Sequence, residues 1–211
     1  MQSSLRFLAI GDSLTAGFCN YGLSNHPYAI NLLKLFSLSN ISIIIDQKGV
    51  SGECVVSSMV KRLENLVFNE HSPHYNWIIL LGGTNDLAYR KSAQIIFSQR
   101  LKVMYDMVLQ RTNQDTKLAV MTVIENGYYS PDSKYDQQRQ ILNEMIRNYA
   151  KNHHDQNRIC LVDLDKNIKY HNIEDVNQRN IIWDDFAHLT ADGYDRMAKI
   201  IFQEIYKNIN Q

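Results

Sequence analysis

The chain has 211 residues, of which 45% are hydrophobic and 21% are charged. This length and composition predict an ordinary globular protein in which residues 1–211 form one domain. Lys and Arg together number 22, as do Asp and Glu, so the formal net charge is zero. The sequence therefore lacks the basic excess that is typical of proteins that bind nucleic acid or anionic membranes.

Short apolar segments alternate with longer amphipathic segments along the chain. The short segments are rich in branched residues and bounded by turn residues, which favours strands, whereas the long ones repeat apolar residues every three or four positions, which favours helices. In chain order, the predicted elements are strand 6–10, helix 27–38, strand 41–46, helix 55–68, strand 77–82, helix 92–111, strand 117–124, helix 134–152, strand 158–164 and helix 191–209. Residues 165–189 are predicted to form a long polar loop.

Strands that alternate with helices are typical of a parallel sheet with helices on both faces. Several predicted strands, such as residues 77–82 (WIILLG), are continuous apolar runs, as expected for strands that are buried on both faces. The predicted fold class is therefore α/β. In such folds, ligands bind beyond the carboxyl ends of the strands.

Polar residues that lie far apart in the sequence are predicted to meet at that edge of the sheet. Ser13 follows the first predicted strand, Gly52 the second and Asn85 the third. Asp185 and His188 lie just before the last helix. Each residue has an ordinary structural alternative, because serine and glycine are common in turns and asparagine caps helices. Their convergence at one edge favours a functional site.

Ser13, His188 and Asp185 have the chemistry of a nucleophile, a base and a group that orients the base. A serine hydroxyl attacks a carbonyl only when a base within hydrogen-bond reach takes its proton. Imidazole is such a base near neutral pH, and it needs an acceptor on its other nitrogen to hold the right tautomer. Asp185 stands three residues before His188, within reach in one tight turn. Asp184 is a weaker candidate and is expected to be solvated.

The oxyanion that forms during acyl transfer needs hydrogen-bond donors that are in place beforehand. The predicted donors are the backbone N–H of Ser13, the backbone N–H of Gly52 and the side-chain amide of Asn85. Gly52 suits this role because a side chain there is expected to obstruct its N–H. The alternatives are a strand-to-helix turn at Gly52 and a helix N-cap at Asn85.

These segments resemble the four sequence blocks of the GDSL esterase/lipase family, also called the SGNH hydrolases. The blocks stand here as GDSLTAG (11–17), QKGVSG (47–52), GGTND (82–86) and DFAHLTADGY (185–194). Gln47 replaces the asparagine that is usual at the start of the second block. The resemblance implies a catalytic triad of Ser13, Asp185 and His188. It implies an oxyanion hole formed by Ser13, Gly52 and Asn85.

The resemblance also implies a three-layer α/β/α fold around a five-stranded parallel sheet in the order 2-1-3-4-5. The implied reaction is hydrolysis of esters or thioesters through an acyl-serine, without a cofactor or a metal. The sequence predicts a serine esterase whose partner is a small-molecule ester with a short or medium acyl group. The alternatives are a non-catalytic binding protein on the same fold and an acyltransferase or thioesterase with the same triad. The sequence does not predict the natural ester or the oligomeric state.

Aromatic residues in the loops around this edge are candidates for the walls of the substrate pocket. Residues 18–23 follow the predicted nucleophile, residues 125–131 follow the fourth strand, and residues 181–186 precede the predicted base. The candidate substrate-binding residues in these loops are Tyr128, Tyr129, Trp183 and Phe186. The alternative is that they pack in the core, a reading that applies most strongly to Trp183 and Phe186.

The targeting and cysteine patterns predict a cytoplasmic protein. No apolar run approaches the ~20 residues that cross a bilayer, and the first residues do not have the pattern of a signal peptide. The three cysteines are Cys19, Cys54 and Cys160, and they form no C-x-x-C motif, which favours reduced thiols. A Cys19–Cys54 disulfide is left open, because both residues follow loops that are predicted to converge.

Overall fold

The computed structural model describes residues 4–209 and confirms the predicted α/β class. Its main sheet has five parallel strands in the order β4-β1-β5-β6-β7, which is the implied order 2-1-3-4-5. The strands are β1 (Leu5–Gly11), β4 (Ile43–Gly49), β5 (Trp77–Leu80), β6 (Lys117–Met121) and β7 (Ile159–Val162).

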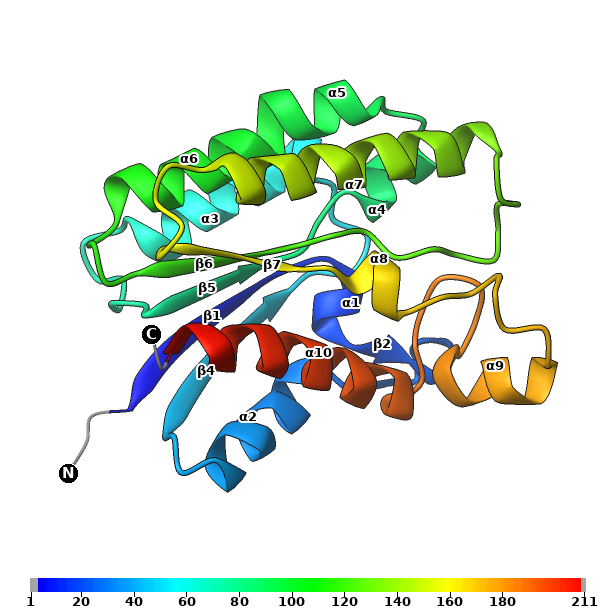
Figure 1. Ribbon diagram of the computed structural model, residues 1–211, viewed down its shortest axis with the longest axis horizontal. Helices are drawn as coiled ribbons and strands as arrows, with labels where there is room; N and C mark the ends of the chain where they lie inside the picture. The colour runs from blue at the N-terminus through cyan, green and yellow to red at the C-terminus, as the bar shows by residue number, and fades with distance from the viewer. Residues whose placement is uncertain (1–3, 210–211) are drawn as a thin grey trace.

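Helices cover both faces of this sheet and form the outer two of three layers (Figure 1). One face is covered by α2 (Tyr28–Leu38) and α10 (Ala191–Ile209). The other face is covered by α3 (Val60–Val67), α5 (Ala93–Ile96), α6 (Lys102–Arg111) and α7 (Lys134–Asn152). Two π-helical segments, η2 (Val55–Met59) and η3 (Phe97–Leu101), divide the helices predicted over 55–68 and 92–111. The apolar pattern of the sequence did not reveal these segments.

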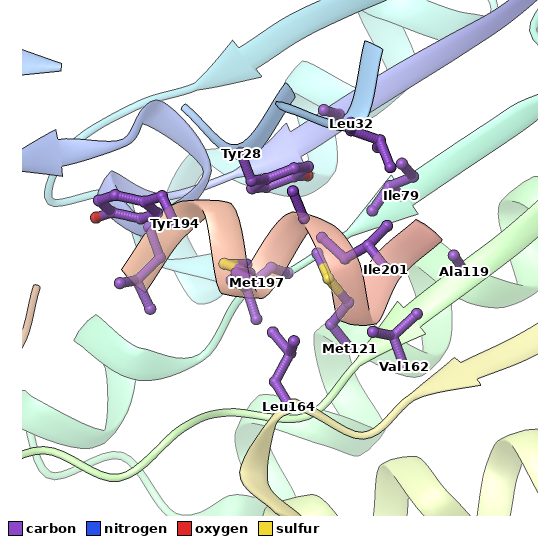
Figure 2. Close-up of a cluster of buried hydrophobic side chains, with 14 of the residues drawn as sticks. Tyr28, Leu32, Ile79, Ala119, Met121, Val162, Leu164, Tyr194, Met197 and Ile201 are labelled. Carbon is purple, nitrogen blue, oxygen red and sulfur yellow. The ribbon is translucent and has the colours of Figure 1, made fainter. Parts of the chain in front are cut away.

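The strands contribute side chains to two hydrophobic cores, one on each face of the sheet. Phe7 and Ala9 of β1 belong to the core beneath α2 and α10, whereas Leu8 and Ile10 belong to the core beneath α3, α6 and α7. This alternation follows from the two-residue period of a strand. In the first core, side chains of α2 and α10 lie against strand residues such as Ile79 (Figure 2). The central strands are therefore buried on both faces, as their continuous apolar sequences predict.

The structure corrects the prediction of a long loop over residues 165–189. This segment contains α8 (Leu164–Asn167) and α9 (Val176–Ile182). Asp175 caps α9 by accepting a hydrogen bond from the Asn177 N–H. The apolar residues of α9 are Val176, Ile181 and Ile182, which are not spaced three or four positions apart, so the sequence lacks the apolar stripe by which helices are recognised. A small hairpin of β2 (Phe18–Cys19) and β3 (Ser24–Asn25), joined by the 3₁₀ turn η1 (Asn20–Gly22), was also not predicted.

Two short helices begin where strands of the main sheet end. They are α1 (Ser13–Ala16), after β1, and α4 (Thr84–Ala88), after β5. A Cβ on Gly49 would lie 2.2 Å from the backbone nitrogen of Ala16, so glycine lets α1 pack closely against the end of β4. Among the described helices, none has the length and apolar character that a membrane span needs.

Candidate active site

Ser13 is presented by a tight turn between β1 and α1. It is the first residue of α1 and is 8% exposed. Asp12 caps the helix, because its Oδ1 accepts a hydrogen bond from the Leu14 N–H at 3.0 Å. Gln47 donates from Nε2 to the Thr15 carbonyl at 2.8 Å, which ties α1 to β4. The residue that departs from the usual second block therefore helps to hold the turn that carries Ser13.

The structure brings the predicted nucleophile, base and carboxylate into one hydrogen-bonded chain. The Oγ of Ser13 lies 3.0 Å from Nε2 of His188, and Nδ1 of His188 lies 2.8 Å from Oδ2 of Asp185. Asp185 Oδ1 also accepts hydrogen bonds from the backbone N–H groups of Ala187 and His188, both at 2.6 Å. The tight turn before α10 thus holds carboxylate and imidazole in a fixed relation.

The hydrogen bonds among Ser13, His188 and Asp185 define which nitrogen of His188 can take a proton from Ser13. Burial raises the pKa of Asp185, but the hydrogen bonds from His188 and from the backbone outweigh it and leave that pKa below its ordinary value. The ionised carboxylate only accepts hydrogen bonds, so Nδ1 of His188 is the donor. Nε2 is then free to accept the proton of the Ser13 hydroxyl.

The second predicted oxyanion donor, Gly52, lies in a turn that requires glycine. The Glu53 N–H donates to the Val50 carbonyl at 3.1 Å, which places Gly52 third in a four-residue turn, and its φ is +78°. A positive φ at this position is typical of a type II turn. A Cβ on Gly52 would meet no atom within 4 Å. The positive φ therefore gives one reason for glycine at this position, and the expectation that a side chain would block access to the N–H stays a prediction.

Asn85 lies within α4 and is not its N-cap, because Gly83 holds that position. The Asn85 Nδ2 donates one hydrogen bond to the Glu53 carbonyl at 3.0 Å. An amide nitrogen carries two hydrogens, so one remains for another acceptor. Within residues 4–209, the backbone N–H groups of Ser13 and Gly52 have no acceptor. Three unsatisfied donors therefore come from the segments that the sequence indicates.

Two buried carboxylates next to these residues brace the loops. Asp86 accepts hydrogen bonds from the N–H groups of Val55 and Val56 at 2.9 and 3.0 Å. Burial raises the pKa of Asp86, and it raises the pKa of Asp12 to about 6. The Oδ2 atom of Asp12 has no hydrogen-bond partner among the described residues. Asp12 thus holds the turn that carries Ser13, and Asp86 holds the start of the helical segment that follows Gly52.

Two of the four aromatic residues predicted as pocket walls pack elsewhere. Trp183 is 3% exposed, belongs to the core beneath α10 and donates from Nε1 to the Lys169 carbonyl. Tyr129 stacks on Tyr135 with ring centroids 4.0 Å apart and packs against the other core. These two placements favour the structural alternative, because a large aromatic ring with few polar groups gains most from burial.

The other two, Tyr128 and Phe186, remain exposed and form a pair. Their ring centroids lie 5.2 Å apart, and 63% of Tyr128 and 51% of Phe186 are exposed. The Gly127 N–H donates to the Phe186 carbonyl, which joins the loop after β6 to the loop that carries His188. Phe186 therefore does not pack in the core, contrary to the alternative considered for it.

The sequence indicated residues 18–23 as a wall of the pocket but did not single out Phe18, whose ring packs on the imidazole of His188 with centroids 4.4 Å apart. Phe18 lies in the hairpin that was not predicted, so its contact with His188 could not be inferred. Asp184 is not simply solvated, since it accepts a hydrogen bond from the Tyr21 N–H. Cys19, Cys54 and Cys160 are free thiols, so the disulfide that was left open is not formed. No group of three or more side chains suited to a metal ion occurs in the part of the chain that the structure describes.

Serine hydrolases on several unrelated folds link a hydroxyl through an imidazole to a carboxylate, and the arrangement at Ser13 is of this class. A family model described as the GDSL-like Lipase/Acylhydrolase family matches residues 9–196. The chain belongs to this family and is a hydrolase of the carboxylic ester type. Comparison with curated protein sequences gave no match.

Solved structures with the same fold cover nearly the whole chain. A family 3 carbohydrate esterase from Clostridium thermocellum has a TM-score of 0.72 at 20% identity, covering 99% of this chain and 98% of that one. A protein of the lipolytic G-D-S-L family from Veillonella parvula has a TM-score of 0.71 at 18% identity, with 95% and 97% covered. An acetylxylan esterase from Geobacillus stearothermophilus has a TM-score of 0.67 at 17% identity, with 96% and 94% covered.

Proposed function

We propose that this chain is a serine esterase that hydrolyses small carboxyl esters through an acyl-serine intermediate, within a single domain. The observation that carries the proposal is the 3.0 Å separation between Ser13 Oγ and His188 Nε2, which are 175 residues apart in sequence. No requirement of secondary structure brings these atoms together. A buried serine hydroxyl that meets an imidazole already held by a carboxylate is poised to lose its proton.

In the proposed mechanism, Ser13 Oγ attacks the ester carbonyl carbon while His188 Nε2 takes the hydroxyl proton. The carbonyl oxygen becomes an oxyanion, which accepts hydrogen bonds from the N–H groups of Ser13 and Gly52 and from the Asn85 amide. The imidazolium then donates its proton to the leaving alkoxide as the carbon–oxygen bond breaks. Asp185 stabilises the imidazolium throughout, and its low pKa keeps it ionised.

Deacylation repeats these steps with water as the nucleophile. His188 takes a proton from water, the hydroxide attacks the acyl-serine, and the protonated imidazole returns the proton to Ser13 Oγ. The carboxylic acid leaves and the enzyme regains its starting state. No redox change occurs in either half-reaction, and every proton transfer passes through Nε2.

We propose that the substrate is an ester with a short or medium acyl group. Tyr128 and Phe186 present exposed aromatic surface on the loops that adjoin His188, and this surface suits an apolar or sugar group of the substrate. The carbohydrate esterase and the acetylxylan esterase that share the fold are consistent with a small acyl group on a larger alcohol. Trp183 is not included in this pocket because it is buried in a core, and Tyr129 is not included because it stacks on Tyr135 and packs against the other core.

The test is a set of p-nitrophenyl esters of increasing acyl length, assayed with the wild-type chain and with Ser13→Ala. We expect turnover that falls as the acyl chain lengthens, and a loss of several orders of magnitude in kcat for the variant with its thermal unfolding unchanged. Equal turnover by Ser13→Ala contradicts the proposal, and no turnover of any ester favours a binding protein on this fold. Added alcohol that diverts the acyl group into a new ester identifies an acyltransferase, whereas preferential turnover of thioesters identifies a thioesterase.

A further inference from the structure

Glu53 connects the two oxyanion donors that lie outside the serine turn. It follows Gly52 directly, and its own N–H closes the turn that gives Gly52 its positive φ. Its carbonyl accepts the hydrogen bond from Asn85 Nδ2 at 3.0 Å. A movement of Glu53 therefore shifts both the Gly52 N–H and the Asn85 amide.

The side chain of Glu53 is buried and is held by Arg62 of α3. Only 4% of the Glu53 side chain and 21% of the Arg62 side chain are exposed. The guanidinium donates from Nε to both carboxylate oxygens, at 3.0 and 3.1 Å, and its Nη2 also bonds Oε2. Ser58 Oγ donates to Oε1 at 2.8 Å. Both carboxylate oxygens of Glu53 therefore accept hydrogen bonds.

The same guanidinium reaches the ends of two strands. Its Nη2 donates to the Gly11 carbonyl at 3.0 Å, and its Nη1 donates to the Lys48 carbonyl at 2.5 Å. Gly11 ends β1, two residues before Ser13, and Lys48 is the penultimate residue of β4. One planar cation thus joins the strand that carries the nucleophile to the turn that carries the oxyanion donors. The rigid fork of arginine suits this task, whereas lysine presents a single point charge.

Stability alone is a weak explanation for this arrangement, because desolvation of a buried ion pair offsets most of its attraction. We propose that Arg62 is a positioning residue, which sets the distance between Ser13 and the Gly52–Asn85 oxyanion donors by holding Glu53. This inference rests on the proposed function. Donors that stabilise a transition state must be fixed before the reaction, and a misplacement of about 1 Å costs about 10²-fold in rate.

The inference predicts how kcat and KM change when the fork is removed. In Arg62→Lys, the ammonium keeps a positive charge near Glu53. It cannot reach the carbonyls of Gly11 and Lys48 at the same time, so the turn that contains Gly52 becomes less fixed. We expect kcat for p-nitrophenyl acetate to fall about 10-fold or more while KM changes little, because the oxyanion forms only in the transition state. Arg62→Met should lower kcat further. The pair Glu53→Gln/Arg62→Met should regain thermal stability, because no unpaired charge is left buried, but not kcat.

Arg158 provides the matched control. It is 5% exposed, and its guanidinium donates to the carbonyls of Leu109, Asn113 and Thr116 at the opposite end of the sheet. Arg158→Lys should lower the unfolding temperature and leave kcat at the wild-type value. A loss of kcat in both lysine variants, in proportion to their loss of stability, means that Arg62 has only a structural role and overturns the inference.

A double-mutant cycle with Asn85→Ala completes the test. If Arg62 acts through the oxyanion donors, Arg62→Lys should cost much less in kcat when Asn85 is already alanine than it does in the wild type. Independent, multiplicative losses overturn the inference even if each variant is slow. The Ser13→Ala control separates the two proposals: Ser13-dependent turnover with wild-type kcat in Arg62→Lys overturns this inference alone. Wild-type protein without Ser13-dependent turnover overturns the proposed function as well.

Discussion

Asp12 provides a test of the electrostatics beside the nucleophile that does not depend on activity. The residue is fully buried, and burial, together with the negative charge of Asp86, raises its pKa from 3.8 to about 6. Hydrogen bonding from the Leu14 N–H and the proximity of His188 oppose this rise without cancelling it. The folded state therefore prefers protonated Asp12 more than the unfolded state does.

The sign and size of the effect on stability follow from linkage. Above about pH 6, Asp12 is ionised in both states, and the folded state carries the full cost of the buried charge. A shift from 3.8 to about 6, at 1.36 kcal/mol per unit, corresponds to about 3 kcal/mol. As the pH falls through 6 toward 4, the folded state takes up a proton first, and the cost disappears.

Asp12→Asn removes the charge but keeps an oxygen that accepts the hydrogen bond from Leu14. Urea unfolding of both proteins between pH 4 and pH 8 gives the difference in unfolding free energy at each pH. We expect this difference to move in favour of the variant by about 2 kcal/mol from pH 4 to pH 8, because the unfolded chain is only partly protonated at pH 4. A difference that stays constant with pH, or that moves in favour of the wild type, refutes the raised pKa of Asp12.

Three further substitutions test the site. Asn85→Ala should lower kcat by about 10²–10³-fold with little change in KM, because it removes one oxyanion donor, and steady-state kinetics with wild-type rates would exclude that role. Asp185→Asn should lower kcat by about 10⁴-fold, because an amide also donates and stabilises the wrong tautomer of His188; a loss below tenfold would contradict it. Gly52→Ala should cost about 1 kcal/mol in chemical denaturation, since only its φ is strained, whereas Gly49→Ala should cost far more because its Cβ meets Ala16. Equal costs for the two alanine variants would contradict the close packing of Gly49 against Ala16.

Much of the fold could be predicted because β1, β5, β6 and β7 are short and largely apolar, although β4 carries Asp46, Gln47 and Lys48. Such segments have few alternatives to a buried parallel sheet. The strand order came from the family resemblance and not from the apolar pattern, since pattern alone does not specify which strands pair. The site residues were found because each stands at the carboxyl end of a strand or just before the last helix, where the topology of the sheet brings them together.

The parts that could not be predicted depend on contacts between distant segments. The helix α9 has a polar sequence with no stripe to reveal it, and the contact of Phe18 with His188 exists only after the hairpin has folded. Trp183 and Phe186 lie in one short loop, yet one is buried and the other exposed. Composition cannot separate them, because the difference arises from the way the loop turns between α9 and His188. The same holds for Arg62, whose partners come from three separate segments.

Covalent labelling with a sulfonyl fluoride is the most direct test of the claim that Ser13 is an activated nucleophile. Mass spectrometry of the digested protein locates the modified residue, and the reaction is repeated with Ser13→Ala and His188→Ala. The account predicts one adduct, on Ser13, which is absent in the first variant and forms far more slowly in the second. An unlabelled wild-type protein, or labelling of another serine such as Ser51 at the same rate in all three proteins, would contradict it.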